Sequence, residues 1–301
     1  MTEYTTRPDG RFGYRVLDPM PSREELEAFY RETYYRLIDE GRRAADIGRS
    51  RRGGPEADDQ ARWLAETVHR DIADTIAAQT PGRRVVEVGC GLGDLMVSLR
   101  GAGFDPVGVD LAESAVEAVR AKGMAVHGGA FTDLVDDGIL QPDSVDAVLF
   151  VNMLEQSFDP VANLAAARRI LVPGGVAVVR SGNDFNPLQE AAVTGLDMKR
   201  WWISGPEHIN YLSFDAVEAM MAGTGLEPVD RLADFPMELF LLLGFPYIGD
   251  GALGAECHRR RVAFERLLPT EVRRSLYRAL AQAGMGRCLL VTGRKPPVAP
   301  A

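Results

Sequence analysis

The sequence predicts an α/β protein with a doubly wound, seven-stranded, mostly parallel sheet. From residue 83 onward, short apolar runs alternate with stretches of helical periodicity. Glycine ends several of the helical stretches, and Pro173-Gly174-Gly175 ends another. Alternation of this kind is typical of right-handed βαβ units, whose strands form a parallel sheet covered by helices on both faces.

The expected elements follow one another in a regular order. Strands are expected at residues 84–89, 106–111, 124–129, 144–154, 176–182 and 225–235. Helices are expected at residues 94–103, 114–123, 159–171 and 213–225, the last with Ser213 as its N-cap. The final stretch 286–295 (GRCLLVTGRK) is expected to close the sheet as an edge strand.

Composition and charge restrict the classes of function. The 301 residues include 34 Lys and Arg against 43 Asp and Glu, a formal charge of −9, whereas nucleic-acid binding usually requires a basic surface. Basic runs such as 259–261 are interpreted as solvated helix faces. The three cysteines have neither disulfide-framework nor zinc-site spacing, which predicts a reducing compartment and no metal.

The chain is also expected to be cytoplasmic and to stay out of the membrane. Its first residues, MTEYTTRPDGRFGYR, contain no apolar core of a signal peptide. The most apolar run, residues 235–248 (FPMELFLLLGFPYI), contains Glu238 and two prolines and is too short to span a bilayer.

The stretch VVEVGCGLGD at residues 85–94 indicates the kind of ligand. In an open α/β sheet the loop after the first strand lies at the ligand-binding edge, where glycine lets the backbone approach a ligand. A dinucleotide fold requires G-x-G-x-x-G, with the pyrophosphate at the helix N-terminus. Here the spacing is Gly89-x-Gly91-x-Gly93, followed by Asp94, and Glu87 lies just before the loop. Acids at this place repel a diphosphate and favour a cationic ligand.

This stretch resembles the first motif of the class I S-adenosylmethionine-dependent methyltransferases, and other stretches agree. Asp110 ends the second strand in GVDLAESAVEAVR, where the family holds an acid. Residues 146–160 (DAVLFVNMLEQSFDP) resemble the family's fourth strand, and residues 170–180 (ILVPGGVAVVR) its fifth. The resemblance covers about residues 83–235 and implies a Rossmann-like fold with S-adenosylmethionine as cofactor.

The resemblance also implies roles for single residues. Asp110 is expected to accept hydrogen bonds from both ribose hydroxyls, at about 1.5–3 kcal/mol each, and Leu111 to pack on the adenine. The implied cofactor-binding residues are Glu87, Gly89, Gly91, Gly93, Asp110, Leu111, Phe131, Asn152 and Tyr30.

Two stretches depart from the family's pattern. The third strand is followed by Gly129-Ala130-Phe131, where relatives often carry Gly-Asp for the adenine amino group. Asp133 is the candidate substitute for that acid, and Phe131 is expected to shape the pocket. The fourth strand is followed by Leu154-Glu155-Gln156 instead of Leu-Glu-His, so any chemistry that relatives perform with this histidine is missing here.

His208 is the candidate catalytic residue. Methyl transfer from a sulfonium is an in-line displacement, and a general base helps only when the acceptor loses a proton, as a hydroxyl does. His208 lies in residues 199–215 (KRWWISGPEHINYLSFD), a segment that passes over the active site in this fold. Many relatives carry a similar Pro-x-His. In the alternative interpretation, His208 hydrogen-bonds a neighbouring turn and orders the loop.

The acceptor-binding residues are expected in the same region. They are Asn183, Asp184, Trp201, Trp202 and Tyr211. Asn and Asp at a strand end can bind acceptor hydroxyls, but turn capping explains them equally well. The tryptophans can form an aromatic wall near the sulfonium, worth about 0.5–2 kcal/mol, but ordinary packing also explains them.

Four segments are expected along the chain. They are an N-terminal helical cap at 1–82, the cofactor-binding core at 83–235, a helical insertion at 236–285 and the closing strand and tail at 286–301. Relatives fold such a cap over the cofactor, and Tyr30 lies on its expected helix. An insertion of this length is usually a lid or an oligomer surface.

These features predict a methyltransferase that acts on a small-molecule acceptor, with oxygen favoured because His208 offers a base. N- or C-methylation stays open, as does a homodimer, and the resemblance implies secondary-metabolite or sugar tailoring as the setting. Two alternatives of other classes are an NAD(P)-dependent oxidoreductase, which the glycine spacing disfavours, and a catalytically inactive cofactor-binding partner subunit.

Overall fold

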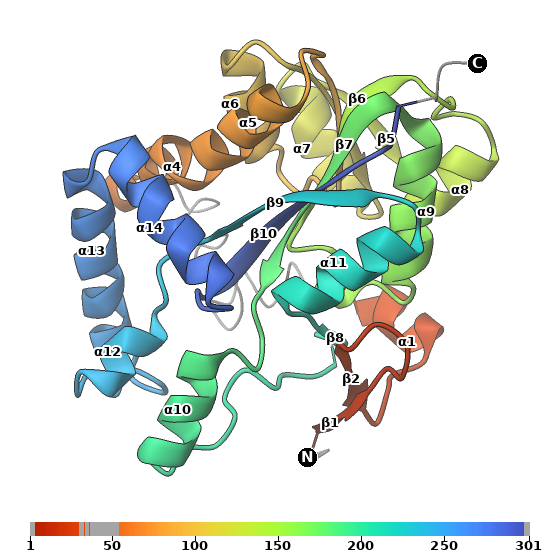
Figure 1. Cartoon of the computed structure of the whole chain (residues 1–301). Coiled ribbons are helices and arrows are strands. Elements are labelled where there is room, and N and C mark those ends of the chain that lie inside the picture. Colours follow the sequence, from red (N-terminus) through yellow and green to blue (C-terminus); the bar gives the residue numbers. More distant parts are fainter. Residues whose placement is uncertain (1–3, 30–32, 34–35, 37–53, 207, 298–301) are drawn as a thin grey trace.

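A seven-stranded sheet with the order β5-β4-β3-β6-β7-β10-β9 forms the centre of the computed structural model (Figure 1), which describes residues 4–29, 33, 36, 54–206 and 208–297. Its strands are β3 (Arg84–Val88), β4 (Asp105–Asp110), β5 (Ala125–Gly128), β6 (Val145–Val151), β7 (Leu171–Gly182), β9 (Glu227–Ala233) and β10 (Cys288–Arg294). Neighbouring strands from β5 to β7 are parallel, whereas β10 is antiparallel to both β7 and β9.

The described helices lie on both faces of this sheet and beside it. They are α1 (Arg23–Ala28), α4 (Pro55–Glu66), α5 (Val68–Gln79), α6 (Asp94–Gly101), α7 (Glu113–Ala121), α8 (Phe131–Asp136), α9 (Pro160–Ile170), α10 (Pro187–Gly195), α11 (Phe214–Gly223), α12 (Glu238–Leu242), α13 (Gly251–Leu267) and α14 (Thr270–Gln282), with a short 3₁₀ turn η2 (Leu154–Gln156). In the described part of the chain, no helix combines the length and apolar character that a membrane crossing needs.

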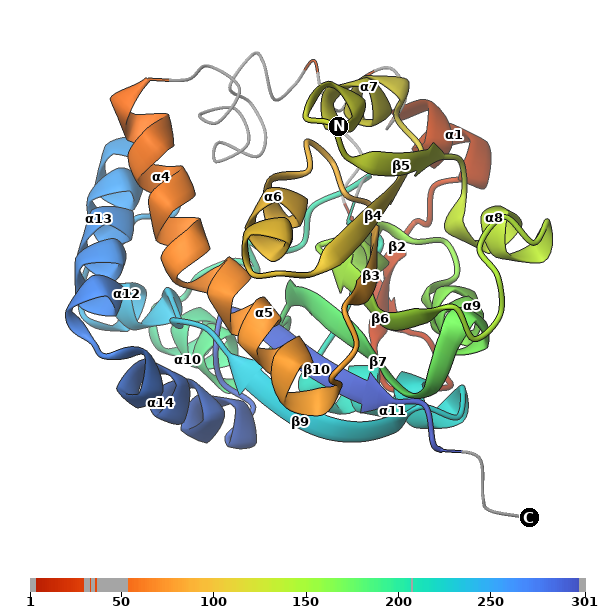
Figure 2. The same ribbon diagram turned by 90° about the horizontal axis from the view of Figure 1, so that it is seen from above.

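Side chains of the central strands alternate between two apolar layers, as the period of a strand requires. Val148 and Phe150 of β6 pack with α8, α9 and α11, whereas Ala147 and Leu149 pack with α5, α6 and α14. Figure 2 shows these two groups of helices on opposite sides of the sheet. The predicted doubly wound α/β fold is therefore confirmed.

The prediction that the last strand lies at the edge of the sheet is wrong. β10 lies between β7 and β9, and its residues pair on both sides, Leu289 with Ser181 and with Ala233. Its side chains also contact both apolar layers. Leu290 belongs to the layer of Leu149, and Val291 belongs to the layer of Phe150. A nearly continuous apolar run such as CLLV is typical of a strand covered on both faces, and that composition fits an interior position better than an edge.

The first segment is not wholly helical, whereas the sequence predicts a helical cap. β1 (Thr5–Pro8) and β2 (Arg15–Asp18) form a three-stranded antiparallel sheet with β8 (Asn210–Tyr211). Asp9 makes the turn between β1 and β2, because its carboxylate accepts hydrogen bonds from three backbone N–H groups within the next four residues. Strand β2 is thus paired with β8, although the two strands lie about 200 residues apart in the sequence.

The helices at 55–79 and those of the insertion pack against each other. The indole N–H of Trp63 in α4 donates to Glu265 of α13 at 2.6 Å. Asp71 of α5 accepts hydrogen bonds from Arg273 at 3.0 Å and Arg274 at 2.9 Å in α14. Two segments expected as separate units therefore form one helical wall beside the sheet.

Candidate functional site

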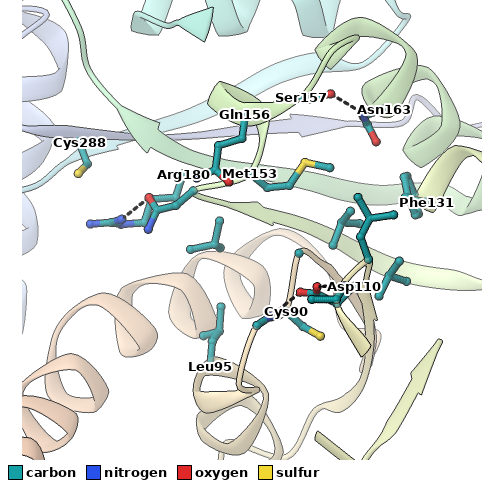
Figure 3. A pocket seen from close by; sticks show the side chains of 18 of the residues that line it. Cys90, Leu95, Asp110, Phe131, Met153, Gln156, Ser157, Asn163, Arg180 and Cys288 are labelled. Atoms are coloured by element: carbon teal, nitrogen blue, oxygen red, sulfur yellow. Dashed lines mark hydrogen bonds between the residues drawn. The ribbon is translucent and has the colours of Figure 1, made fainter. Parts of the chain in front are cut away.

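A cavity of about 1090 Å³ lies at the carboxyl ends of the parallel strands. This volume is slightly above the usual range for small-molecule sites, roughly 300–1,000 Å³. The glycine loop, the ends of β4 and β6, α4, α5 and the insertion all contribute to its wall. Figure 3 shows Asp110 and Phe131 toward one end of the cavity and Arg180 and Cys288 toward the other.

The three glycines of the loop between β3 and α6 adopt positive φ angles, 73° at Gly89, 52° at Gly91 and 75° at Gly93. A Cβ atom on Gly91 would meet nothing within 4 Å, whereas one on Gly93 would lie 2.9 Å from Cγ2 of Val119. Gly89 and Gly91 line the cavity. Gly91 thus leaves the backbone open to a ligand, while Gly93 allows α6 to pack against α7.

Asp110 ends β4 and holds the glycine loop in place. Its Oδ2 accepts a hydrogen bond from the backbone N–H of Gly91 at 2.8 Å, and Oδ1 accepts one from Ala112 at 2.9 Å. Burial raises the pKa of Asp110, and the backbone N–H groups of Ala112 and Gly91 oppose that shift. The next residue, Leu111, lines the cavity with 63% of its surface exposed. A large exposed apolar side chain beside a carboxylate is suited to a ligand with an aromatic ring and hydroxyl groups.

The negative charge expected from Glu87 and Asp94 is smaller than their residue types suggest. Glu87 is buried beneath the loop, and burial raises its pKa to about 8, with further contributions from the charges of Asp110 and Asp94. Its Oε2 has no hydrogen-bond partner among the described residues. Asp94 pairs with Lys122 at 2.7 Å. Glu87 is therefore mostly protonated at neutral pH, and a bound cation would restore its charge.

Two other predicted cofactor residues line the same cavity. Phe131 is buried at the start of α8 and meets Phe150 edge to face, with 5.8 Å between ring centroids. Asn152 follows β6 with a φ of 51°, and its Oδ1 accepts a hydrogen bond from Arg180 at 3.0 Å. Asp133, the candidate substitute for the adenine contact, is not part of the described wall. Tyr30 lies outside the described residues.

His208 and the predicted acceptor-binding residues form a cluster beside the three-stranded sheet, and none of them belongs to the described wall of the cavity. Nε2 of His208 lies 3.3 Å from Oδ2 of Asp184, and the imidazole stacks on Tyr211 with 4.6 Å between centroids. Trp201 and Trp202 meet edge to face at 4.9 Å, and Trp202 also packs against Phe185. For the two tryptophans, these contacts are the ordinary packing of the alternative interpretation, and the catalytic role of His208 stays a prediction.

Asn183 also has a structural use for its side chain. Its amide donates to the carbonyl oxygens of Gly284 at 2.9 Å and Gly286 at 3.1 Å. These two carbonyls belong to the chain that leads into β10, so the amide fixes the approach of the last strand. The hydroxyl of Tyr211 similarly accepts the backbone N–H of Ser204. Contacts of this cluster with an acceptor stay predictions.

The sequence interpretation missed most of the cavity wall that lies away from the glycine loop. The lining residues that it missed are Arg180, Asp234, Tyr247, Arg261 and Arg287, together with Gln60, Trp63, His69, His258 and Cys288. An arginine inside the apolar strand 176–182 is one signal that could have pointed to this region, because a charge in a buried strand requires a partner.

His69 bonds to Ser98 at 2.8 Å, and burial lowers the pKa of His69 to about 4.

Comparison with known proteins gives one family. Residues 59–231 match the family model described as "Methyltransferase domain". A ubiquinone biosynthesis O-methyltransferase of Cereibacter sphaeroides is 30% identical over 178 residues, covering 56% of this chain and 71% of that protein. Another, from Methylococcus capsulatus, is 38% identical over 122 residues, covering 38% of this chain and 50% of that protein.

Solved structures resemble the whole fold. A SAM-dependent methyltransferase from Archaeoglobus fulgidus has a TM-score of 0.54 at 16% identity, covering 87% of this chain and all of that chain. The 1,6-didemethyltoxoflavin-N1-methyltransferase of Burkholderia thailandensis has a TM-score of 0.53 at 14% identity, covering 98% of this chain and all of that chain. At such identities the likeness concerns the fold alone.

Proposed function

Since the chain belongs to the methyltransferase-domain family and is an S-adenosylmethionine-dependent methyltransferase, we propose that it transfers the methyl group to an oxygen atom of a small-molecule acceptor. The observation that carries this proposal is the cavity of about 1090 Å³, which runs from the glycine loop to the insertion. It has room for a cofactor and an acceptor together. Oxygen is favoured because the curated relatives are named O-methyltransferases.

The acidic end of the cavity fits S-adenosylmethionine. Asp110 would accept the ribose hydroxyls, since each carboxylate oxygen can accept a second hydrogen bond besides the one from the backbone. Leu111 would pack on the adenine, and Gly89 and Gly91 would bring the backbone close to the methionine part. Phe131 and Asn152 would complete the wall, while Glu87 and Gly93 would act through the shape and charge of the loop.

The bound cofactor supplies a methyl group on a positively charged sulfur, and the chain supplies position and charge. A cation bound at the loop would favour the ionised form of Glu87, which lies beneath the loop. The helices α4 and α13 border the cavity through Trp63 and His258, whose rings meet edge to face at 5.1 Å. This border helps to keep water from the reacting atoms and to hold the acceptor oxygen in line.

The base for a hydroxyl acceptor stays a prediction. The sequence predicts His208 for this role, but the described cavity wall contains His69 and His258 instead. His69 is a weak base, because burial lowers its pKa to about 4. The setting in secondary-metabolite or sugar tailoring also stays a prediction, since the similar curated proteins are named for ubiquinone biosynthesis. A homodimer is a further prediction.

The test combines binding with product analysis. Calorimetry measures S-adenosylhomocysteine binding, and cofactor with a deuterated methyl group is then incubated with hydroxyl, amine and carbon-acid acceptors. Mass spectrometry and NMR locate the label. An O-linked label supports the proposal, and an N- or C-linked label overturns its choice of oxygen. Tight binding without transfer to any acceptor would instead support the catalytically inactive partner subunit.

A further inference from the structure

Three arginines line the part of the cavity that β7, α13 and the start of β10 form. Arg180 lies in β7, Arg261 lies in α13, and Arg287 is the residue directly before β10. All three side chains line the cavity. Cys288 pairs with Gly182 at the carboxyl end of β7, which places Arg287 at the ligand-binding edge of the sheet. Figure 3 shows Arg180 and Cys288 close together there.

Two of these arginines are neutralised by carboxylates. Oδ2 of Asp234 accepts from Arg180 at 3.3 Å and from Arg261 at 3.2 Å, and Oδ1 accepts the backbone N–H of Cys288 at 2.7 Å. Arg261 also bonds to Glu265 at 3.3 Å. Two guanidinium groups thus face two carboxylates, so this array forms a fixed wall with little spare charge.

Arg287 differs from the other two. Its side chain is 45% exposed and makes no hydrogen bond with the described residues. Its ion-pair partner in the described chain is Glu238, at 3.8 Å, which is beyond hydrogen-bond distance. Glu238 is fully buried outside the cavity wall, and burial raises its pKa. The guanidinium of Arg287 thus borders the cavity with N–H donors that no described acceptor takes at hydrogen-bond distance.

A hydroxyl group lies in the same part of the cavity. Tyr247 lines the wall, and its buried OH has no hydrogen-bond partner among the described residues. Tyr247 packs against the cluster of Met237, Phe240 and Cys257, and Glu238, which directly follows Met237, is the residue that pairs with Arg287. Burial raises the pKa of Tyr247 to about 12, so the hydroxyl keeps its proton at neutral pH. A buried donor without a partner costs about 1–3 kcal/mol, which a ligand oxygen would recover.

We propose that Arg287 and Tyr247 bind a carboxylate group of the methyl acceptor, an inference that rests on the proposed function. A planar guanidinium with a neighbouring hydroxyl donor matches the two oxygens of a carboxylate. A single guanidinium whose ion-pair partner lies beyond hydrogen-bond distance also suits the single negative charge of a carboxylate better than a doubly charged phosphate. The acceptor is therefore assigned to the class of hydroxylated carboxylic acids.

S-Adenosylmethionine carries a carboxylate of its own, and the spacing of the strands favours the acceptor over the cofactor as the partner of Arg287. β10 stands four positions from β4 in the sheet, which at about 4.8 Å per strand separates Arg287 from the strand of Asp110 by about 19 Å. Only a few single bonds join the ribose to the carboxylate of the cofactor. In the complex with S-adenosylhomocysteine the carboxylate of the cofactor is already present, so an acid that binds to this complex through Arg287 brings a second carboxylate.

Binding to the complex with S-adenosylhomocysteine tests this assignment. Calorimetry compares 3-hydroxybenzoate, 4-hydroxybenzoate and 4-hydroxycinnamate with their methyl esters, using wild type, Arg287→Gln and Tyr247→Phe. Arg259→Gln is the matched control, because Arg259 lies on α13, is exposed and pairs with Glu256. We expect at least one acid to bind wild type at least about 10-fold more tightly than its ester, a preference that Arg287→Gln abolishes and Tyr247→Phe reduces.

The outcomes separate the sources of the carboxylate. Equal binding of acids and esters, failure of all three acids to bind, or a preference that survives in Arg287→Gln overturns the proposal. If Arg287→Gln weakens S-adenosylhomocysteine as much as the acids, the carboxylate belongs to the cofactor, which also overturns it. Melting temperatures show whether Arg287→Gln is folded. If it is not, the acid preference of Tyr247→Phe decides whether the proposal holds. Failure of the proposed function is distinct, since it appears as absence of methyl transfer by wild type.

Discussion

The backbone N–H of Gly91 donates a 2.8 Å hydrogen bond to Oδ2 of Asp110. This bond joins the glycine loop after β3 to the end of β4, so the loop and the carboxylate keep one relative position. A ligand held by Asp110 is thereby also placed against the backbone of Gly91, at the position where a Cβ atom would meet nothing.

Replacing Asp110 by Ala is expected to weaken S-adenosylhomocysteine by about 100-fold or more. Two charge-assisted hydrogen bonds to the ribose are lost at about 1.5–3 kcal/mol each, and the loop loses its anchor. Asp105→Ala is the matched control, because Asp105 is an exposed residue at the other end of the same strand. Calorimetry that finds equal affinity in the two variants would contradict the assignment of Asp110.

Gly91→Ala and Gly123→Ala form a second matched pair. Both glycines have positive φ angles, 52° and 67°, and neither would place a Cβ atom within 4 Å of another group. Each substitution should cost about 1–2 kcal/mol of stability through backbone strain. Only the methyl group that Gly91→Ala adds would enter the ligand's space, so we expect similar losses in melting temperature but reduced cofactor binding in Gly91→Ala alone. Equal affinities would place the ligand away from this loop.

Glu87 should make the unliganded protein less stable as the pH rises. Its pKa of about 8 in the folded protein lies above the ordinary 4.5, so between these values the folded chain retains a proton that the unfolded chain has lost. The free energy of unfolding then falls with pH across this window, by at most about 1.4 kcal/mol per unit.

Urea titrations at several pH values check this dependence. The difference between the unfolding free energies of wild type and Glu87→Gln isolates the pH dependence that Glu87 causes. Glu117→Gln, at an exposed site on α7, should leave the pH dependence of wild type unchanged. In wild type itself, the free energy of unfolding falls less steeply with pH between about pH 4 and 6.5 than Glu87 alone would cause. The reason is that the lowered pKa of His69 makes stability rise with pH in this range. A difference curve that is flat from pH 5 to 8 would rule out a raised pKa at Glu87.

Removing the Asp71 carboxylate is expected to destabilise the fold by about 3–5 kcal/mol, since Arg273 and Arg274 are left buried without their partner. Asp74→Ala is the control on the same helix, because its pair with Arg70 is exposed and should change stability by less than about 0.5 kcal/mol. Denaturant unfolding measures both. Similar values for the two variants would mean that this pair does not tie α5 to α14.

Replacing His208 by Gln is expected to affect stability more than turnover. The ring stacks on Tyr211 and contacts Asp184 outside the described cavity wall, so we expect kcat to change by less than about 10-fold while the melting temperature falls. A general base contributes about 10²–10⁴-fold. A loss of kcat of that size, without a lower melting temperature, would instead establish the base role that the sequence predicts.

The parts of the site that the sequence predicts are local in the chain. Gly89, Gly91 and Asp110 belong to short strand–loop–helix units, where residue type and spacing fix the backbone and direct the side chains to one edge of the sheet. Exposure and charge were harder to predict, because the pKa of Glu87 depends on its burial beneath the loop and Asp94 is paired with Lys122 of another unit.

The remaining parts depend on contacts between distant segments. Asp234 meets Arg180 and Arg261 only because β10 enters between β7 and β9, and a sequence pattern read one element at a time does not show that order. For Asn183 the residue type suited a ligand contact, yet its amide is used by two carbonyls about 100 residues further along.

The interior position of β10 has a consequence for the way the protein is made. During synthesis on the ribosome, β7 and β9 emerge before β10, the strand that lies between them. More than 100 residues separate Ser181 of β7 from Leu289, its partner in β10. Until then an apolar strand edge stays unpaired, which is a hazard for self-association. The glycine loop can form early in synthesis, whereas Arg287 arrives with the last strand. The part of the cavity that we assign to the carboxylate of the acceptor is therefore completed last.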